Sequence, residues 1–156
     1  MGIYEKLQAL QITLPPAAKP VAAYSMYSQT GNLVFLSGHI AKKDGAAWVG
    51  QLGKDLTTGE GKLAARAVGI DLLSTLQAAA GGDLERVKRI VKVLSLVNST
   101  ADYTEHHLVT NGVSEFLVEI LGDKGVHARS AFGVAQLPMG ACVEIELIAE
   151  LEDSAL

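Results

Sequence analysis

The sequence predicts an α+β domain in which a mixed or antiparallel sheet carries two helices on one face. Two long segments place apolar residues at helical spacing, and several shorter segments alternate apolar with polar residues or carry β-branched runs. Because strands precede a helix twice along the chain, both helices can cover the same face of the sheet. The 156 residues, 49% of them hydrophobic, suit one packed core, so we expect a single domain over 1–156.

A short helix and an extended connector are expected over residues 1–20, ahead of the core over 21–150. The first residues place an apolar side chain at every third or fourth position, which is typical of a helix. Pro15 and Pro16 end this pattern, because a proline lacks the amide hydrogen that a helix interior needs.

Two strands and a hairpin are predicted next. The alternation over 23–27 predicts a strand, Gly31 marks a turn, and the β-rich run 33–38 predicts a second, central strand. The segment 42–61 carries turn residues on both sides of Trp48, so it is expected to form a loop or a hairpin.

Two amphipathic helices are predicted, with a strand over 87–97 between them. The first helix is expected to end at Gly81 and to bury one apolar stripe: Leu63, Ala67, Ile70, Leu73 and Leu76. Thr104 is expected to cap the second helix, which ends at Gly122. Its predicted apolar stripe is Leu108, Val109, Val113, Phe116, Leu117 and Ile120. Residues 126–134 and 142–148 predict two final strands joined by a turn at Pro138.

Charge, cysteine content and motifs exclude several classes of function. The net charge of −4 and the lack of a basic stripe indicate no nucleic-acid partner. The single cysteine, Cys142, cannot form a disulfide within the chain and is expected to be a buried apolar residue. The histidines lack a metal-binding spacing and no nucleotide-binding motif is present, so we expect no metal and no cofactor. Without a signal-peptide core or a membrane span, the protein is expected to be cytoplasmic with no membrane partner.

Arg129 and the pair Glu144 and Glu146 are the residues of the last strands that can carry chemistry. A planar guanidinium suits bidentate binding of a carboxylate, so Arg129 is interpreted either as an anion anchor in a small-molecule cleft or as a structural salt bridge. The alternation around the two glutamates places both on one strand face, about 7 Å apart. One of them can act as a general acid or base, or both can simply face solvent.

Three segments near the C-terminus resemble the signature of the reactive intermediate deaminase family, also called the YjgF or Rid family: 128–130, 134–138 and 143–146. The segment 32–38 resembles the first core-strand motif of that family, and Asn111 resembles part of its second-helix segment. The resemblance covers most of residues 21–150. It implies a chorismate-mutase-like α+β fold, a homotrimer, and three ligand clefts between neighbouring subunits.

The resemblance also implies hydrolysis of enamine or imine acids to keto acids and ammonia, without a metal or organic cofactor. Arg129 would anchor the carboxylate of the small substrate and Glu144 would orient a water molecule. The further substrate-binding residues would be Tyr24, Ser37, Gly38 and Asn111. Ala131 stands where the archetypal branch of the family commonly has a cysteine.

Two other functions remain open at this point. A non-catalytic trimer that binds small carboxylates or other proteins would use the same arginine and agrees with the Ala131 departure. A ribonuclease is suggested by family labels alone, and the acidic charge and the lack of aromatic stacking platforms beside basic residues disfavour it.

Overall fold

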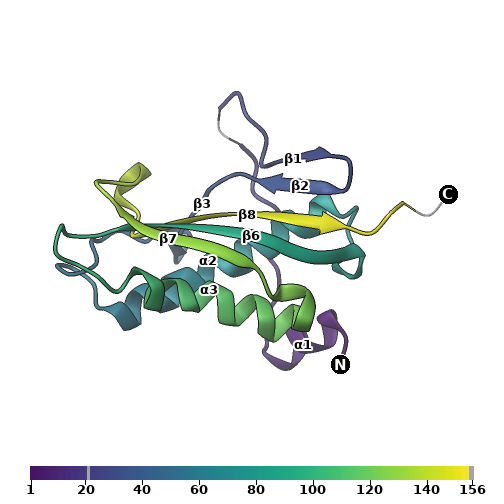
Figure 1. Ribbon diagram of the computed structural model, residues 1–156, viewed down its shortest axis with the longest axis horizontal. Helices are drawn as coiled ribbons and strands as arrows, with labels where there is room; N and C mark the ends of the chain where they lie inside the picture. The colour runs from purple at the N-terminus through teal and green to yellow at the C-terminus, as the bar shows by residue number, and fades with distance from the viewer. Residues whose placement is uncertain (21, 155–156) are drawn as a thin grey trace.

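The computed structural model describes residues 1–20 and 22–154, which form a mixed sheet with helices on one side (Figure 1). The strand order is β1-β2-β8-β6-β7, and the short β3 pairs with β8. Within this described sheet the β6–β7 pair is parallel and the other pairs are antiparallel. The helices and strands are α1 Ile3–Ala9, β1 Tyr27–Thr30, β2 Leu33–Leu36, β3 His39–Ile40, β4 Lys42–Lys43, β5 Ala46–Ala47, α2 Thr58–Ala79, η1 Leu84–Arg86, β6 Val87–Asn98, α3 His106–Leu121, η2 Gly122–Gly125, β7 Ala128–Val134, η3 Pro138–Gly140 and β8 Val143–Leu151.

Both long helices pack on the same face of the sheet, which confirms the predicted architecture (Figure 1). They meet the buried side chains of the central strands, among them Val93 on β6 and Ile145 on β8. The two helices approach each other closely at Gly112 of α3. A Cβ added there would lie 2.9 Å from the carbonyl carbon of Lys62 on α2, and closer still to its oxygen. The residue at this crossing must therefore be glycine.

Helix α2 begins in a capping box, because the Thr57 hydroxyl accepts a hydrogen bond from the Glu60 amide and the Glu60 side chain reaches back to Thr57. It ends just before Gly81, as predicted, and Gly81 has a positive φ of 75°. The predicted apolar stripe is only partly right, because Leu73 and Leu76 are fully buried whereas Leu63 is 61% exposed. The rest of the buried face consists mainly of smaller side chains that let α3 approach: Gly61, Ala64, Ala65, Val68 and Gly69.

Helix α3 has the predicted buried stripe in its central and last turns. Val113, Phe116 and Ile120 are at most 1% exposed, whereas Leu108 at the start of the helix is exposed. The predicted cap at Thr104 is wrong, since the helix starts at His106 and its N-cap, Glu105, makes no side-chain hydrogen bond to the helix.

The first hairpin differs from the prediction. The expected strand over 23–27 is wrong, because the first strand is β1 (Tyr27–Thr30) and the chain before it bends. The tight turn at Gly31, with a φ of 57°, pairs Thr30 with Leu33 and thereby fixes the register of β1 against β2. All four residues of β1 are exposed, so burial did not impose the alternation that the prediction relied on.

The expected hairpin around Trp48 is present as β4 and β5. The indole ring of Trp48 lies under the ammonium group of Lys43, with Nζ 4.9 Å from the ring centroid. The Trp48 amide donates to the Ala41 carbonyl, and its carbonyl accepts from the Cys142 amide. These bonds attach the hairpin to the start of the last strand.

The two final strands form as predicted but do not pair with each other, because β6 lies between β7 and β8. The chain passes from β6 through α3 to the parallel strand β7, and a helix is the usual connection for parallel neighbours. Cys142, just before β8, is fully buried, and burial raises the pKa of its thiol to about 11. This agrees with the predicted role of an apolar core residue.

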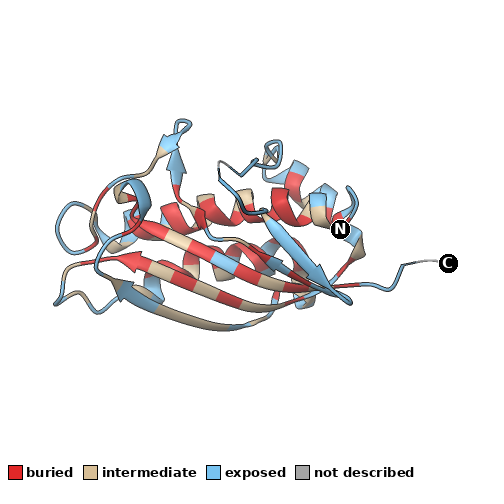
Figure 2. Cartoon of the chain, turned by 90° about the horizontal axis from the view of Figure 1, so that it is seen from above, coloured by how far each residue is buried: buried red, intermediate tan, exposed pale blue. Residues whose placement is uncertain are grey.

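The sheet face opposite the helices has no covering layer among residues 1–20 and 22–154 (Figure 2). Buried and more exposed positions alternate along the strands, as expected for a sheet that is covered on one face only. Large apolar side chains lie on the open face: Leu33, Phe35 and Phe132, which are 37%, 42% and 47% exposed. No helix in the described part of the chain has the length and hydropathy needed to cross a membrane.

Candidate functional site

The residues predicted to form the site fall into two groups on opposite faces of the sheet. Arg129 on β7 pairs with Val93, a fully buried residue of the helix-covered face. Glu144 on β8 pairs with Leu96, which belongs to the open face. Since directly paired residues of neighbouring strands point to the same side, the two predicted catalytic residues project in opposite directions within one chain.

The first group surrounds Arg129 at the edge of the sheet, where β7 meets α3. The guanidinium donates two hydrogen bonds, from Nη1 to the Ser114 hydroxyl at 3.1 Å and from Nη2 to the His107 carbonyl at 3.3 Å. No carboxylate among the described residues lies within ion-pair distance of it. Arg129 is thus a half-buried cation held by neutral partners, and the salt-bridge interpretation has no partner in the described chain.

Ser114 is in turn bonded to a histidine that the sequence analysis did not place in the site. The Nε2 atom of His127 lies 2.9 Å from the Ser114 hydroxyl, and its Nδ1 atom lies 2.6 Å from the Gly125 carbonyl. Burial lowers the pKa of His127, and the positive charge of Arg129 lowers it further, against the opposing effect of the Gly125 hydrogen bond. The ring is therefore neutral near neutral pH.

Asn111 belongs to the same group by its position on α3. It lies four residues after His107 and three before Ser114, and residues at these spacings share one helix face. Its side chain is half-buried. Asn111 therefore shares the face of α3 whose residues His107 and Ser114 bond Arg129.

The second group surrounds Glu144 on the open face. Its carboxyl group lies directly against the Cα of Gly38, where an added Cβ would be 3.0 Å from the Glu144 Cδ atom. Burial raises the pKa of the Glu144 carboxyl, and the negative charge of Glu146 on the same strand face raises it further. A carboxyl group with a raised pKa is suited to accept and return protons nearer neutral pH.

Ser37 directly precedes Gly38 of this second group, and its hydrogen bonds reach the bend that contains Tyr24. The Ser37 hydroxyl donates to the Ser25 carbonyl at 2.6 Å, and the Ser37 amide donates to the Met26 carbonyl at 2.8 Å. These bonds hold the bend that precedes β1 beside the end of β2. Tyr24, in that bend, is 50% exposed and free to contact a ligand.

The two groups are too far apart to act on one small molecule within a single chain. Glu144, Leu96 and Phe132 are successive neighbours across β8, β6 and β7, which separates the outer two by about 10 Å. Arg129 lies three residues before Phe132, about 10 Å further along the strand, and points to the other face. A site that contains both predicted catalytic residues therefore requires a second copy of the chain.

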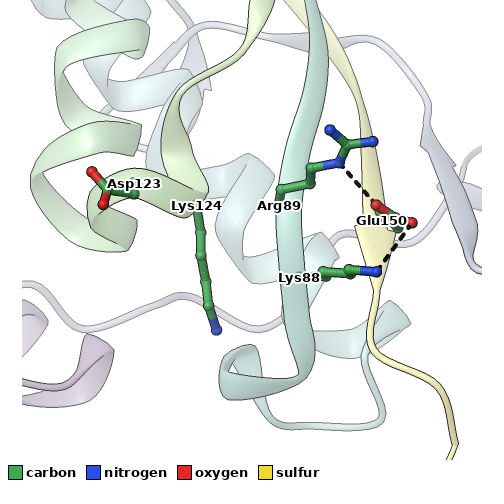
Figure 3. A pocket seen from close by; sticks show the side chains of 5 residues that line it. All are labelled: Lys88, Arg89, Asp123, Lys124 and Glu150. Atoms are coloured by element: carbon green, nitrogen blue, oxygen red, sulfur yellow. Dashed lines mark hydrogen bonds and ion pairs between the residues drawn. The ribbon is translucent and has the colours of Figure 1, made fainter.

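A surface hollow lies elsewhere, at the far end of β6 and β8 (Figure 3). It has a volume of about 450 Å³ and is lined by charged side chains: Lys88, Arg89, Asp123, Lys124 and Glu150. Glu150 already pairs with Arg89 at 2.8 Å and with Lys88 at 3.8 Å, so these charges largely satisfy one another. Within residues 1–20 and 22–154, no cluster of three or more His, Cys, Asp or Glu side chains could hold a metal ion.

Comparison with known proteins gives a consistent family. Residues 4–151 match the family model described as "YjgF/chorismate_mutase-like, putative endoribonuclease". The chain is 46% identical over 149 residues to "Protein TCP17" of Trypanosoma cruzi, covering 94% of this chain and 92% of that protein. It is 28% identical over 141 residues to the 2-iminobutanoate/2-iminopropanoate deaminase of Dermatophagoides farinae, covering 90% and 95%. A crystal structure of a "putative endoribonuclease" from Shewanella oneidensis superposes with a TM-score of 0.91 at 30% identity, covering 97% of this chain and 100% of that one.

Proposed function

Because this chain belongs to the YjgF/chorismate mutase-like family, we propose that it hydrolyses small 2-imino acids and their enamine tautomers to 2-keto acids and ammonia. The fold is the chorismate-mutase-like α+β fold that the sequence predicted. The relative from Dermatophagoides farinae is named as a deaminase of this substrate class. The observation that carries the proposal is the half-buried Arg129, which has no carboxylate partner in the described chain.

Arg129 supplies the substrate anchor in this proposal. Two of its five N–H donors are used by Ser114 and His107, which leaves others for a substrate carboxylate. A bidentate pair of this kind fixes both the position and the plane of a small acid. Asn111, on the face of α3 that carries Ser114 and His107, would contact the rest of the small molecule.

Glu144 supplies proton transfer to and from water. The water oxygen adds to the imine carbon while the Glu144 carboxylate accepts one water proton, and the Glu144 carboxyl group then donates that proton to the nitrogen. The resulting amino alcohol passes its hydroxyl proton to the nitrogen through Glu144 and loses ammonia as its C–N bond breaks and the C=O bond of the keto acid forms. The close contact with Gly38 fixes the carboxyl group in one place for both steps.

We further propose that the site forms between copies of the chain in a homotrimer. The Arg129 group and the Glu144 group lie on opposite faces of one chain, so a shared site takes one group from each of two subunits. The open face exposes Leu33 and Phe35 on β2 and Phe132 on β7, and large apolar side chains on an uncovered sheet face support assembly.

The test is ammonia release from 2-aminoacrylate and longer imino acids generated in situ by an amino-acid dehydratase. Wild type is expected to accelerate release over the uncatalysed reaction, while Arg129→Ala and Glu144→Gln lose about tenfold or more of this acceleration. Arg89→Ala is the matched control, because it removes a strand arginine from the distant Glu150 ion pair. Folded wild-type trimer that binds a keto acid but hydrolyses no imine would replace the proposal with a non-catalytic carboxylate-binding protein.

A further inference from the structure

We propose that His127 and Ser114 are positioning residues, in which the neutral imidazole orients the serine hydroxyl so that its oxygen holds the Arg129 guanidinium. This inference rests on the proposed role of Arg129 as a carboxylate anchor. The two residues would not touch the substrate themselves. They would act by fixing where the guanidinium presents its free donors.

The direction of every hydrogen bond in this chain of groups follows from one carbonyl. The Gly125 carbonyl, 2.6 Å from His127 Nδ1, can only accept, so Nδ1 carries the proton of the neutral ring. Nε2 is then an acceptor, and the Ser114 hydroxyl 2.9 Å away donates to it. The lone pairs of the Ser114 oxygen are left for Arg129 Nη1 at 3.1 Å, which can only donate.

Protonation of His127 would disrupt this arrangement. Nε2 would become a donor, so the Ser114 oxygen would face two cationic donors and its own hydrogen would have no acceptor in the chain of bonds. Two positive charges would then meet at one hydroxyl group, which is unfavourable in a half-buried place. The guanidinium is therefore expected to leave its position as the ring becomes charged.

The charged groups around His127 do not provide an alternative partner. Arg129 on β7 acts on the ring directly and lowers its pKa, as does burial. The other chargeable side chains on the elements packed against it make no hydrogen bond to it: Lys92 on β6, Asp123 and Lys124 in η2, and His107 and Glu115 on α3. Glu115 is instead paired with Lys62 of α2 at 3.0 Å.

The same device occurs a second time, beside the other group of candidate residues. His39 follows Gly38, its Nδ1 atom lies 2.6 Å from the Ser37 carbonyl, and its Nε2 atom lies 2.7 Å from the Thr75 hydroxyl of α2. In both cases a histidine bonds the carbonyl two residues before it and a hydroxyl of the covering helix. In the second case the histidine ties the Ser37–Gly38 segment, which contacts Glu144, to α2.

The first experiment measures the side-chain nitrogens by NMR in the full-length protein without ligand, so its result does not depend on enzymatic activity. At about pH 7.5 the neutral Nδ1–H form of His127 and separate, slowly rotating Nη signals of Arg129 are expected. Ser114→Ala should merge the Nη signals, whereas Ser114→Thr should keep them, because threonine retains the hydroxyl group. Unchanged Arg129 signals in Ser114→Ala, or a protonated His127 at this pH, would overturn the inference.

The second experiment measures the affinity for 2-oxobutanoate by calorimetry. Ser114→Ala is expected to bind about tenfold more weakly, since a hydrogen bond to a charged group is lost, and Ser114→Thr should bind like wild type. Wild-type affinity should fall as His127 becomes protonated, and His127→Gln, whose amide oxygen can accept from Ser114, should flatten that pH profile. If this affinity pattern is found without imine hydrolysis, the positioning role stands and the deaminase proposal is refuted. If the protein hydrolyses imines and Ser114→Ala does so equally well, the deaminase proposal stands and the positioning role is refuted.

Discussion

Replacement of Gly112 by alanine tests whether the close crossing of α2 and α3 determines the stability of the domain. The added Cβ would lie 2.9 Å from the carbonyl carbon of Lys62, at least 0.5 Å short of the 3.4 Å at which ordinary contact begins. The obstacle is helix backbone, so the two helices must separate rather than one side chain rotate. Because backbone cannot rotate out of the way, the cost lies at the upper end of the range of about 1–3 kcal/mol for overpacking.

The gain in helix propensity offsets part of this cost. Alanine is favoured over glycine inside a helix by about 1 kcal/mol, so a steric cost at the upper end of the range leaves a net loss of about 2 kcal/mol. For a chain of this length, that loss lowers the thermal midpoint by about 4–8 °C.

Circular dichroism melts at one fixed protein concentration measure this shift, with Gly59→Ala in α2 as the control. A Cβ at Gly59 meets only the Thr57 hydroxyl oxygen, at 3.9 Å, so that variant receives the helix propensity without the clash. It should melt at or slightly above the wild-type temperature. A Gly112→Ala protein that is as stable as wild type would show that the helices do not meet as described.

Three further predictions concern the site and its protonation. Gly38→Ala should displace the Glu144 carboxyl group and slow imine hydrolysis about tenfold or more; equal activity would contradict the assigned contact. Three histidines have a pKa lowered mainly by burial, so the unfolded chain binds their protons more readily: His39, His106 and His127. These groups should therefore make the free energy of unfolding, measured with urea, fall as the pH drops through ~6.5. A rise over that pH range would contradict the lowered pKa values. The buried Cys142 thiol, with its pKa of about 11, should react with an aromatic disulfide at pH ~8 only after denaturation, and fast labelling of the native protein would refute its burial.

The architecture could be predicted because local sequence patterns carried it. The alternation around Glu144 placed its carboxyl group on the open face, and the structure confirms that register. The stripe through Val113 and Phe116 likewise predicted the buried face of α3. In these segments burial on one side and exposure on the other impose the period that the sequence shows.

The failures arose where burial does not dictate the sequence. The strand expected over 23–27 lies instead at Tyr27–Thr30, because the turn at Gly31 and not a buried face sets its position. The stripe predicted for α2 included the exposed Leu63, whereas the first turns of the helix bury small residues against α3. Thr104 had the right chemistry for a helix cap but lies too far before the first helical residue.

The site was predicted only in part, since its contacts join distant segments. Arg129 and Glu144 were chosen from the family resemblance, but spacing gave no indication that they face opposite sides of the sheet. Ser114 and His127 are thirteen residues apart and meet only because α3 crosses over to the parallel strand β7. The sequence showed a histidine, His127, two positions before Arg129, but its role depends on the Ser114 hydroxyl, which only the fold brings close to it.

Because Trp48 lies in the docked β4–β5 hairpin, its fluorescence can be used to follow the unfolding of that hairpin. Trp48 is the single tryptophan of the chain, and its backbone bonds join the hairpin to the residues that lead into β8. Its emission therefore reports the release of this hairpin, whereas far-ultraviolet dichroism reports the helices. Coincident transitions by the two probes would mean that the hairpin unfolds together with the helices, and an earlier change in emission would mark it as a separately opening unit of lower stability.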